Sequence, residues 1–198
     1  MDWEIFKVSN GIPVIYKEKT DGFSTALAVW IKTGSRYEPT SVNGISHFIE
    51  HLLFKGTKTR TAQDIKEAIE GKGGSFNAFT SEELTCYYIK ILEHYLDTAF
   101  DVLSDMVKNP LLASQDIKNE RNVIIEEIKM YYDTPARFVH DLFDQTLFEN
   151  HPLGALISGT EQTVSAITRE NISGFIKKYY SNKNIVISIC GKFDRERN

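Results

Sequence analysis

The order of strand-like and helical segments is the feature that most constrains the fold of this 198-residue chain. Strands are expected at 4–8, 13–17, 23–33, 76–79, 84–92 and 185–190, and helices at 43–56, 61–70, 95–108, 114–132, 135–149 and 169–180. Mostly strands, then helices, then a closing strand predict an α+β fold. We expect a two-layer sandwich, in which helices pack on one face of a mostly antiparallel sheet. Because no repeat, low-complexity segment or linker interrupts the chain, residues 1–198 are expected to form a single domain.

Turn-forming and helix-capping residues support several of these boundaries. The Asn10-Gly11 pair between two strand patterns is a strong hairpin signal. Thr61 is expected to cap the helix that follows it, and Gly71 is expected to end that helix.

Composition excludes some classes of function. The net charge of −4 implies no general attraction to nucleic acid or to an anionic membrane. No apolar run approaches the length of a membrane span. The first residues, Met1–Glu4, lack the basic and apolar regions of a secretory signal, so a cytoplasmic protein is expected unless a cleaved leader precedes them. Cys86 and Cys190 lie in strand patterns and are expected to be inert buried thiols.

The segment His47-Phe48-Ile49-Glu50-His51 has the form H-x-x-E-H, the inverse of the usual zinc-protease signature. On a helix, His47 and His51 are four residues apart and share a face, so both imidazoles can reach one metal ion. Glu50 lies about 60° round the helix from His47 and can act on water at the same place. The apolar neighbours predict that this helix is buried, which makes a plain charged surface helix a poor alternative.

A catalytic zinc ion needs a third protein ligand, and the helix at 114–132 offers candidates. On a helical wheel, Glu120 and Glu127 lie about 60° and 80° from Ile117, at the border of the apolar stripe. Glu126 lies about 180° from Ile117, on the face expected to be wet. Glu120 and Glu127 are therefore candidate ligands, although salt bridges to Lys or Arg at the stripe's edge explain the same positions. The histidines outside the motif, His94, His140 and His151, are expected to be structural or solvated.

At this point the sequence resembles a known family. The segment from Gly44 to Thr57 looks like the zinc-binding helix of the pitrilysin, insulin-degrading enzyme and mitochondrial processing peptidase family. The pattern of that family continues with a glutamate about 76 residues after the second histidine, and Glu127 stands 76 residues after His51. The resemblance implies that His47, His51 and Glu127 bind Zn²⁺, that Glu50 is the general base, and that Glu120 is an accessory carboxylate.

A second segment, 73–81, resembles the substrate-binding edge strand of the same family. The resemblance implies that an extended peptide pairs with the backbone at Asn77, Ala78 and Phe79. An ordinary strand after a glycine turn is the alternative for this segment taken alone.

The resemblance extends along essentially the whole chain, yet it covers only the first of the two homologous halves found in subunits of that family. It implies a zinc endopeptidase that acts on a peptide substrate and that needs a second homologous half or subunit, as in a dimer. One alternative is a non-catalytic structural or binding subunit, although such subunits typically lose the motif that this chain keeps. The other is a different zinc hydrolase, such as a small-molecule lyase of related fold, which the edge strand and the glutamate spacing disfavour.

Overall fold

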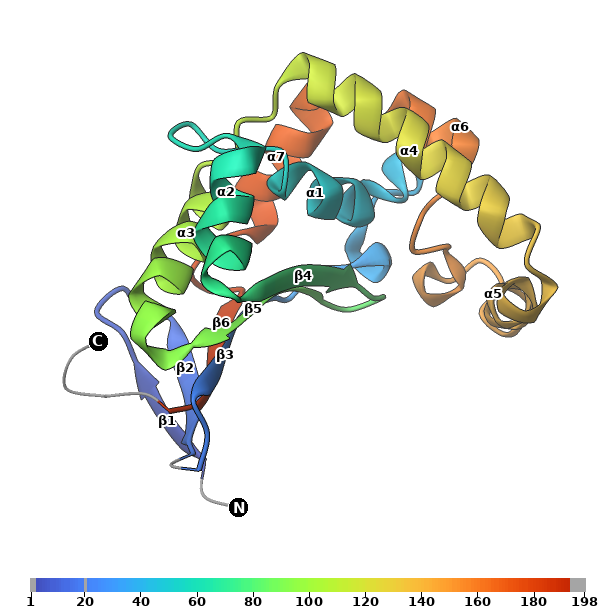
Figure 1. Ribbon diagram of the computed structural model, residues 1–198. Coiled ribbons are helices and arrows are strands. Elements are labelled where there is room, and N and C mark those ends of the chain that lie inside the picture. The colour runs from blue at the N-terminus through green and yellow to red at the C-terminus, as the bar shows by residue number, and fades with distance from the viewer. Residues whose placement is uncertain (1–2, 20, 193–198) are drawn as a thin grey trace.

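A computed structural model describes residues 3–19 and 21–192, and its centre is a six-stranded sheet (Figure 1). Met1 and Asp2, which entered the leader prediction, lie outside the described residues. The strands are β1 (Glu4–Lys7), β2 (Pro13–Glu18), β3 (Ser24–Ile31), β4 (Ser75–Thr80), β5 (Thr85–Leu92) and β6 (Ile185–Gly191). Their order across the sheet is β1-β2-β6-β3-β5-β4, which leaves β4 at one edge.

Most neighbouring strands in this sheet are antiparallel, as predicted. β3 pairs along its whole length with β5 on one side and β6 on the other, both antiparallel. The pair β2–β6 is parallel. A parallel pair needs a long crossover connection, and here all the helices lie between these two strands in the chain. The closing strand therefore lies in the middle of the sheet and joins the first hairpin to the rest.

Helices cover one face of this sheet, which confirms the predicted α+β sandwich (Figure 1). They are α1 (Ile45–Leu53), α2 (Ala62–Ile69), α3 (Leu96–Lys108), α4 (Ser114–Tyr132), α5 (Pro135–Leu147), α6 (Glu161–Ala166) and α7 (Arg169–Tyr179). Side chains of β3 alternate in burial: Leu27, Val29 and Ile31 face the helices, whereas Ala26 is exposed and Trp30 is half-buried on the other face.

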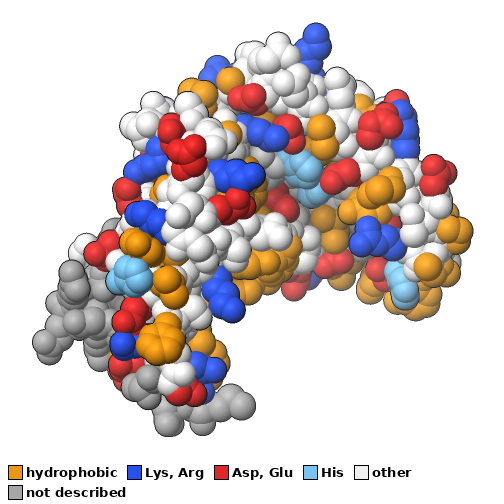
Figure 2. Space-filling model, viewed as in Figure 1, with side chains coloured by type: hydrophobic (Ala, Val, Ile, Leu, Met, Phe, Trp, Pro, Cys, Tyr) orange, Lys and Arg blue, Asp and Glu red, His pale blue; other side chains and the backbone are white. Residues whose placement is uncertain are grey.

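The helices α4 and α5 form an arm that extends away from the sheet (Figure 1). α4 packs on α1 and α6, and it buries Ile117, Ile124 and Ile128. By contrast, α5 contains no fully buried residue. Together with the sheet and its helices, the arm gives the molecule a concave side, which Figure 2 shows as a hollow with histidine side chains near its centre.

Three details differ from the sequence-based expectations. The short helix α6 was not predicted, because six residues carry too little periodicity. Helix α2 gives way to a 3₁₀ turn at 70–72, and Gly73 rather than Gly71 takes the left-handed conformation, with φ of 73°. Cys86 is buried as expected, but Cys190 is only half-buried on the open face of the sheet.

Among the described residues, no helix is long and apolar enough to cross a membrane.

Candidate metal centre and its cavity

The start of helix α1 is fixed by a half-buried carboxylate and a glycine. Glu38 accepts hydrogen bonds from the backbone N–H groups of Gly44 and Ser46, at 2.6 and 2.8 Å, and so caps the helix. Gly44 has φ of 94°, and a Cβ atom there would lie 2.6 Å from the carbonyl oxygen of Ser158. A substitution at Gly44 would therefore shift both the helix that carries the H-x-x-E-H residues and the loop opposite.

Three potential metal ligands converge where α1 meets α4. One donor atom each from His47, His51 and Glu127 lie within 4.8 Å of one another. The two histidine Nε2 atoms are 3.2 Å apart, and Oε2 of Glu127 lies 3.5 Å from that of His51 and 3.8 Å from that of His47. The structure thus brings together the three residues that the sequence suggested.

The donor set fits a zinc ion on three counts. Two tetrahedral ligands at 2.0–2.1 Å from Zn²⁺ are about 3.3 Å apart, which is close to the observed separation of the imidazole nitrogens. Burial and the neighbouring His51 lower the pKa of His47 to about 4, so its imidazole is neutral at pH 7, as a metal ligand must be. In addition, Oε2 of Glu127 is buried without a hydrogen-bond partner among the described residues, which a metal ion would provide.

Glu120 supports the cluster from behind. Its Oε2 lies 3.1 Å from Nδ1 of His51, and its Oε1 forms an ion pair with Lys55 at 2.8 Å. A carboxylate on the far nitrogen of a ligating histidine fixes the ring's tautomer and orientation. The salt-bridge alternative is therefore realised at Glu120, together with the contact to His51.

The other two glutamates of α4 separate as the helical wheel predicted. The side chain of Glu126 is 71% exposed and pairs with Lys129, whereas that of Glu127 is 32% exposed and pairs with no described Lys or Arg. The wheel therefore distinguished a solvated carboxylate from its inward-facing neighbour.

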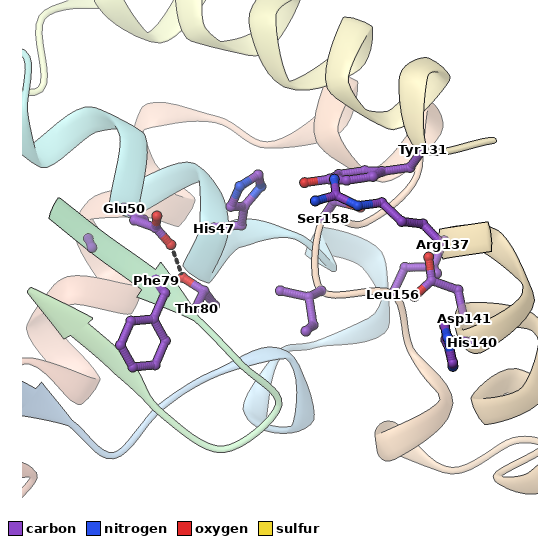
Figure 3. Close-up of a pocket in the computed structure, with 12 residues that line it drawn as sticks. His47, Glu50, Phe79, Thr80, Tyr131, Arg137, His140, Asp141, Leu156 and Ser158 are labelled. Carbon is purple, nitrogen blue, oxygen red and sulfur yellow. Dashed lines mark hydrogen bonds between the residues drawn. The ribbon is translucent and has the colours of Figure 1, made fainter. Parts of the chain in front are cut away.

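Glu50 lies beside the cluster and faces β4. Its carboxylate accepts a hydrogen bond from the hydroxyl of Thr80, drawn as a dashed line in Figure 3. Burial raises the pKa of Glu50, against the lowering effect of that hydrogen bond. A carboxylate whose pKa is raised toward neutrality is a better proton acceptor from water than an ordinary glutamate.

The edge strand β4 runs past Glu50. Ala78 and Thr80 line a cavity together with His47 and Glu50. The ring of Phe79 points away from that cavity in Figure 3 and packs edge-on against Trp30. The side chain of Asn77 accepts a hydrogen bond from the backbone N–H of Ala78 at 2.8 Å. Of the three residues assigned to substrate binding, only Ala78 and Phe79 border the cavity.

This cavity has a volume of about 440 Å³, and its far wall comes from residues that the sequence did not single out as a site. These are Tyr131, Arg137, His140, Asp141, Leu156, Ile157 and Ser158. His140, expected to be structural or solvated, is exposed and lines the cavity. Part of this wall could have been suspected from the sequence, because the segment 131–141 follows closely after Glu127, a predicted metal ligand.

Comparison with known proteins agrees with this geometry. Residues 13–161 match the family model described as insulinase, peptidase family M16, and the chain belongs to that family. It is 42% identical over 186 residues to an uncharacterized zinc protease, YmxG, of Bacillus subtilis. That match covers 94% of this chain and 46% of the relative, so the chain spans about half the length of the curated relatives it matches.

Solved structures show the same fold. A protease from Helicobacter pylori superposes with a TM-score of 0.94 at 27% identity, covering 99% of this chain and 48% of that one. A peptidase M16 inactive domain from Pseudomonas fluorescens superposes with a TM-score of 0.91 at 17% identity, covering 100% and 48%. The second likeness shows the fold alone, and it shows that this fold also occurs in a domain named as inactive.

Proposed function

We propose that this chain provides the zinc site of an endopeptidase that hydrolyses peptide bonds in extended peptides. The observation that carries the proposal is one convergence: His47, His51 and Glu127 meet beside Glu50. His47 and Glu50 line a cavity that is also lined by β4, an edge strand of the sheet among the described residues. A metal site, a general base and an edge strand that an extended peptide can pair with together suit peptide hydrolysis.

The roles of the residues follow from their positions. His47, His51 and Glu127 would hold Zn²⁺, and Glu120 would orient His51 through its Nδ1 atom. Zn²⁺ in such a site polarises a peptide carbonyl and lowers the pKa of water. Glu50 would take a proton from the attacking water and later deliver it to the leaving amine.

The peptide would lie along β4, which has one neighbour in the sheet, β5, and one open edge. The N–H of Ala78 is bonded by Oδ1 of Asn77, so a peptide carbonyl would take the place of that side chain. The small side chain of Ala78 allows close approach of the peptide backbone, and the hydrogen bond from Thr80 holds Glu50 next to it.

We further propose that residues 1–198 are a single domain equivalent to the first half of a two-domain family subunit. A second homologous half, in the same polypeptide or as the other subunit of a dimer, would complete the substrate chamber. The support is that the chain spans 46% of the Bacillus subtilis relative and 48% of the Helicobacter pylori protease. A cytoplasmic location, with no nucleic-acid or membrane partner, remains our prediction from the sequence.

A non-catalytic subunit is the second candidate, favoured by the inactive domain among the structural neighbours. A non-catalytic role needs neither metal ligands nor a base. The present chain nevertheless keeps three inward-facing ligand residues, the base and the accessory carboxylate in one cluster.

Substitution of the base tests the proposal. Glu50→Gln in the zinc-loaded protein should lower the rate of cleavage of quenched peptides by roughly 10²- to 10⁴-fold and leave the zinc content unchanged. Glu126→Gln, the same change on an exposed side chain, is the matched control and should keep full activity. Zinc-dependent cleavage that survives in Glu50→Gln would exclude Glu50 as the base. Failure of the wild type to cleave any peptide, with zinc bound and its second half present, would favour the non-catalytic role.

A further inference from the structure

Arg137 is the cationic side chain on the far wall of the cavity. It lies in the first turn of α5, and its guanidinium carbon is 5.2 Å from the centre of the Tyr131 ring. In Figure 3 the guanidinium lies against this ring and points into the cavity, toward His47. Stacking on an aromatic face restricts the rotamers of an arginine while leaving its N–H donors free.

No carboxylate neutralises this guanidinium within the described residues. Arg137 is exposed and forms no ion pair or side-chain hydrogen bond with any of them. The nearest acid along the helix is Asp141, which Figure 3 places at the far end of the cavity from Glu50, whereas the guanidinium is directed the other way. Burial and the neighbouring Asp144 raise the pKa of Asp141, and Arg137 is not among the groups that shift it.

We propose that Arg137 is a specificity-determining residue that binds a carboxylate of the peptide on the α5 side of the metal cluster. The inference rests on the proposed peptidase function and deepens it, because it names the chemical class of substrate. The carboxylate belongs either to a Glu or Asp side chain near the scissile bond or to the free C-terminus of the peptide.

The geometry of the cavity supports this preference. A guanidinium presents its donors in a planar fork that matches a carboxylate in two parallel hydrogen bonds. Glu50 lines the wall opposite Arg137 and Asp141 lines the outer end, so a substrate carboxylate is repelled at both places and attracted only beside the Arg137 guanidinium between them. About 440 Å³ accommodates one such side chain beside the peptide backbone.

The test uses the zinc-loaded protein together with the segment or subunit that completes it in the cell. Quenched peptides carry Glu, Gln or Lys at each position flanking the scissile bond, and each peptide is made with a free and with an amidated C-terminus. Arg137→Gln removes the cation and Arg137→Glu reverses it. Lys118→Gln is the matched control, since Lys118 is an exposed cation of α4 that does not line the cavity.

We expect the wild type and Lys118→Gln to prefer the carboxylate peptide by roughly tenfold in kcat/KM, mainly through KM, and Arg137→Gln to lose that preference. Arg137→Glu should prefer the Lys peptide. A preference for Glu over Gln peptides that persists on amidation assigns the carboxylate to a side chain. A preference for free over amidated peptides that is the same for Glu and Gln assigns it to the C-terminus.

Peptide binding to Glu50→Gln protein, measured by fluorescence anisotropy, separates this inference from the proposed function. A carboxylate preference in binding that depends on Arg137, without cleavage by the wild type, would refute the peptidase and leave the inference standing. Cleavage or binding by the wild type that is the same for Glu and Gln peptides, and also the same for free and amidated C-termini, would overturn the inference alone. No binding and no cleavage of any peptide would overturn both.

Discussion

Two regions of this molecule bury their apolar residues to very different extents. In the region formed by the sheet with α1, α2, α3 and α7, the apolar side chains between the sheet and the helices are enclosed, and Phe48 of α1 is 0% exposed, whereas Ile5 and Phe79 at the sheet edges are exposed. In the arm, α5 has no buried residue, and its exposed apolar side chains are Val139, Leu142, Phe143 and Leu147. Figure 2 shows hydrophobic side chains gathered at that end of the molecule.

The candidate metal centre lies at the seam between these regions. His47, Glu50 and His51 come from the enclosed helix α1, and Glu127 comes from α4, which leads into the arm. The ligand cluster is therefore held by a well-packed core, whereas the opposite cavity wall includes Arg137, His140 and Asp141 of α5, the helix without a buried residue. With the roles proposed above, catalysis and substrate selection would rest on different parts of the fold, which fits the use of rigid elements for catalytic groups.

Matched truncations of two phenylalanines test this contrast most strongly. Phe48→Ala should destabilise the protein by about 3–5 kcal/mol, because it leaves a cavity in the core. Phe143→Ala should change stability by no more than about 0.5 kcal/mol, since Phe143 is 62% exposed. Urea denaturation of both variants and of the wild type measures the difference. Comparable losses of unfolding free energy in the two variants would show that another segment or subunit covers α5 in the protein that was measured.

A smaller effect is expected from the carboxylate behind the cluster. Glu120→Gln keeps the volume of the side chain but removes the charge that faces Nδ1 of His51 and Lys55. We expect zinc affinity to fall by roughly 10- to 100-fold, since carboxylates that orient ligating histidines typically contribute that much. Competition with a chromogenic chelator gives the affinity. An unchanged affinity would reduce Glu120 to a partner of Lys55.

Local periodicity explains why so much of the fold was predictable. The six strands and the six longest helices follow from patterns within single segments, and the helical wheel distinguished Glu126 from Glu120 and Glu127. Features set by distant contacts were not predictable. The parallel pairing of β2 with β6 depends on the path of the whole chain, and the half-buried Cys190 depends on which face the helices cover.

The candidate site divides in the same way. The spacing of His47, Glu50 and His51 is local and readable, and the resemblance to a peptidase family singled out Glu127. The cavity wall was missed because Arg137 and Ser158 lie in different segments that meet only through tertiary packing. Lys55 was missed because a lysine at the end of an amphipathic helix has no distinguishing pattern, and its role appears only through its ion pair with Glu120.

The central claim is that α1 and α4 together form one metal site, and a comparison of zinc content in adjacent glutamate variants tests it most directly. The wild type and Glu126→Gln, dialysed against dilute zinc and measured by atomic emission, should each retain one Zn²⁺ per chain. Glu127→Gln should lose most of its zinc with its fold intact by circular dichroism, because it removes the charged third ligand. Equal zinc retention in the two variants would contradict the account, and so would a wild-type protein that binds none.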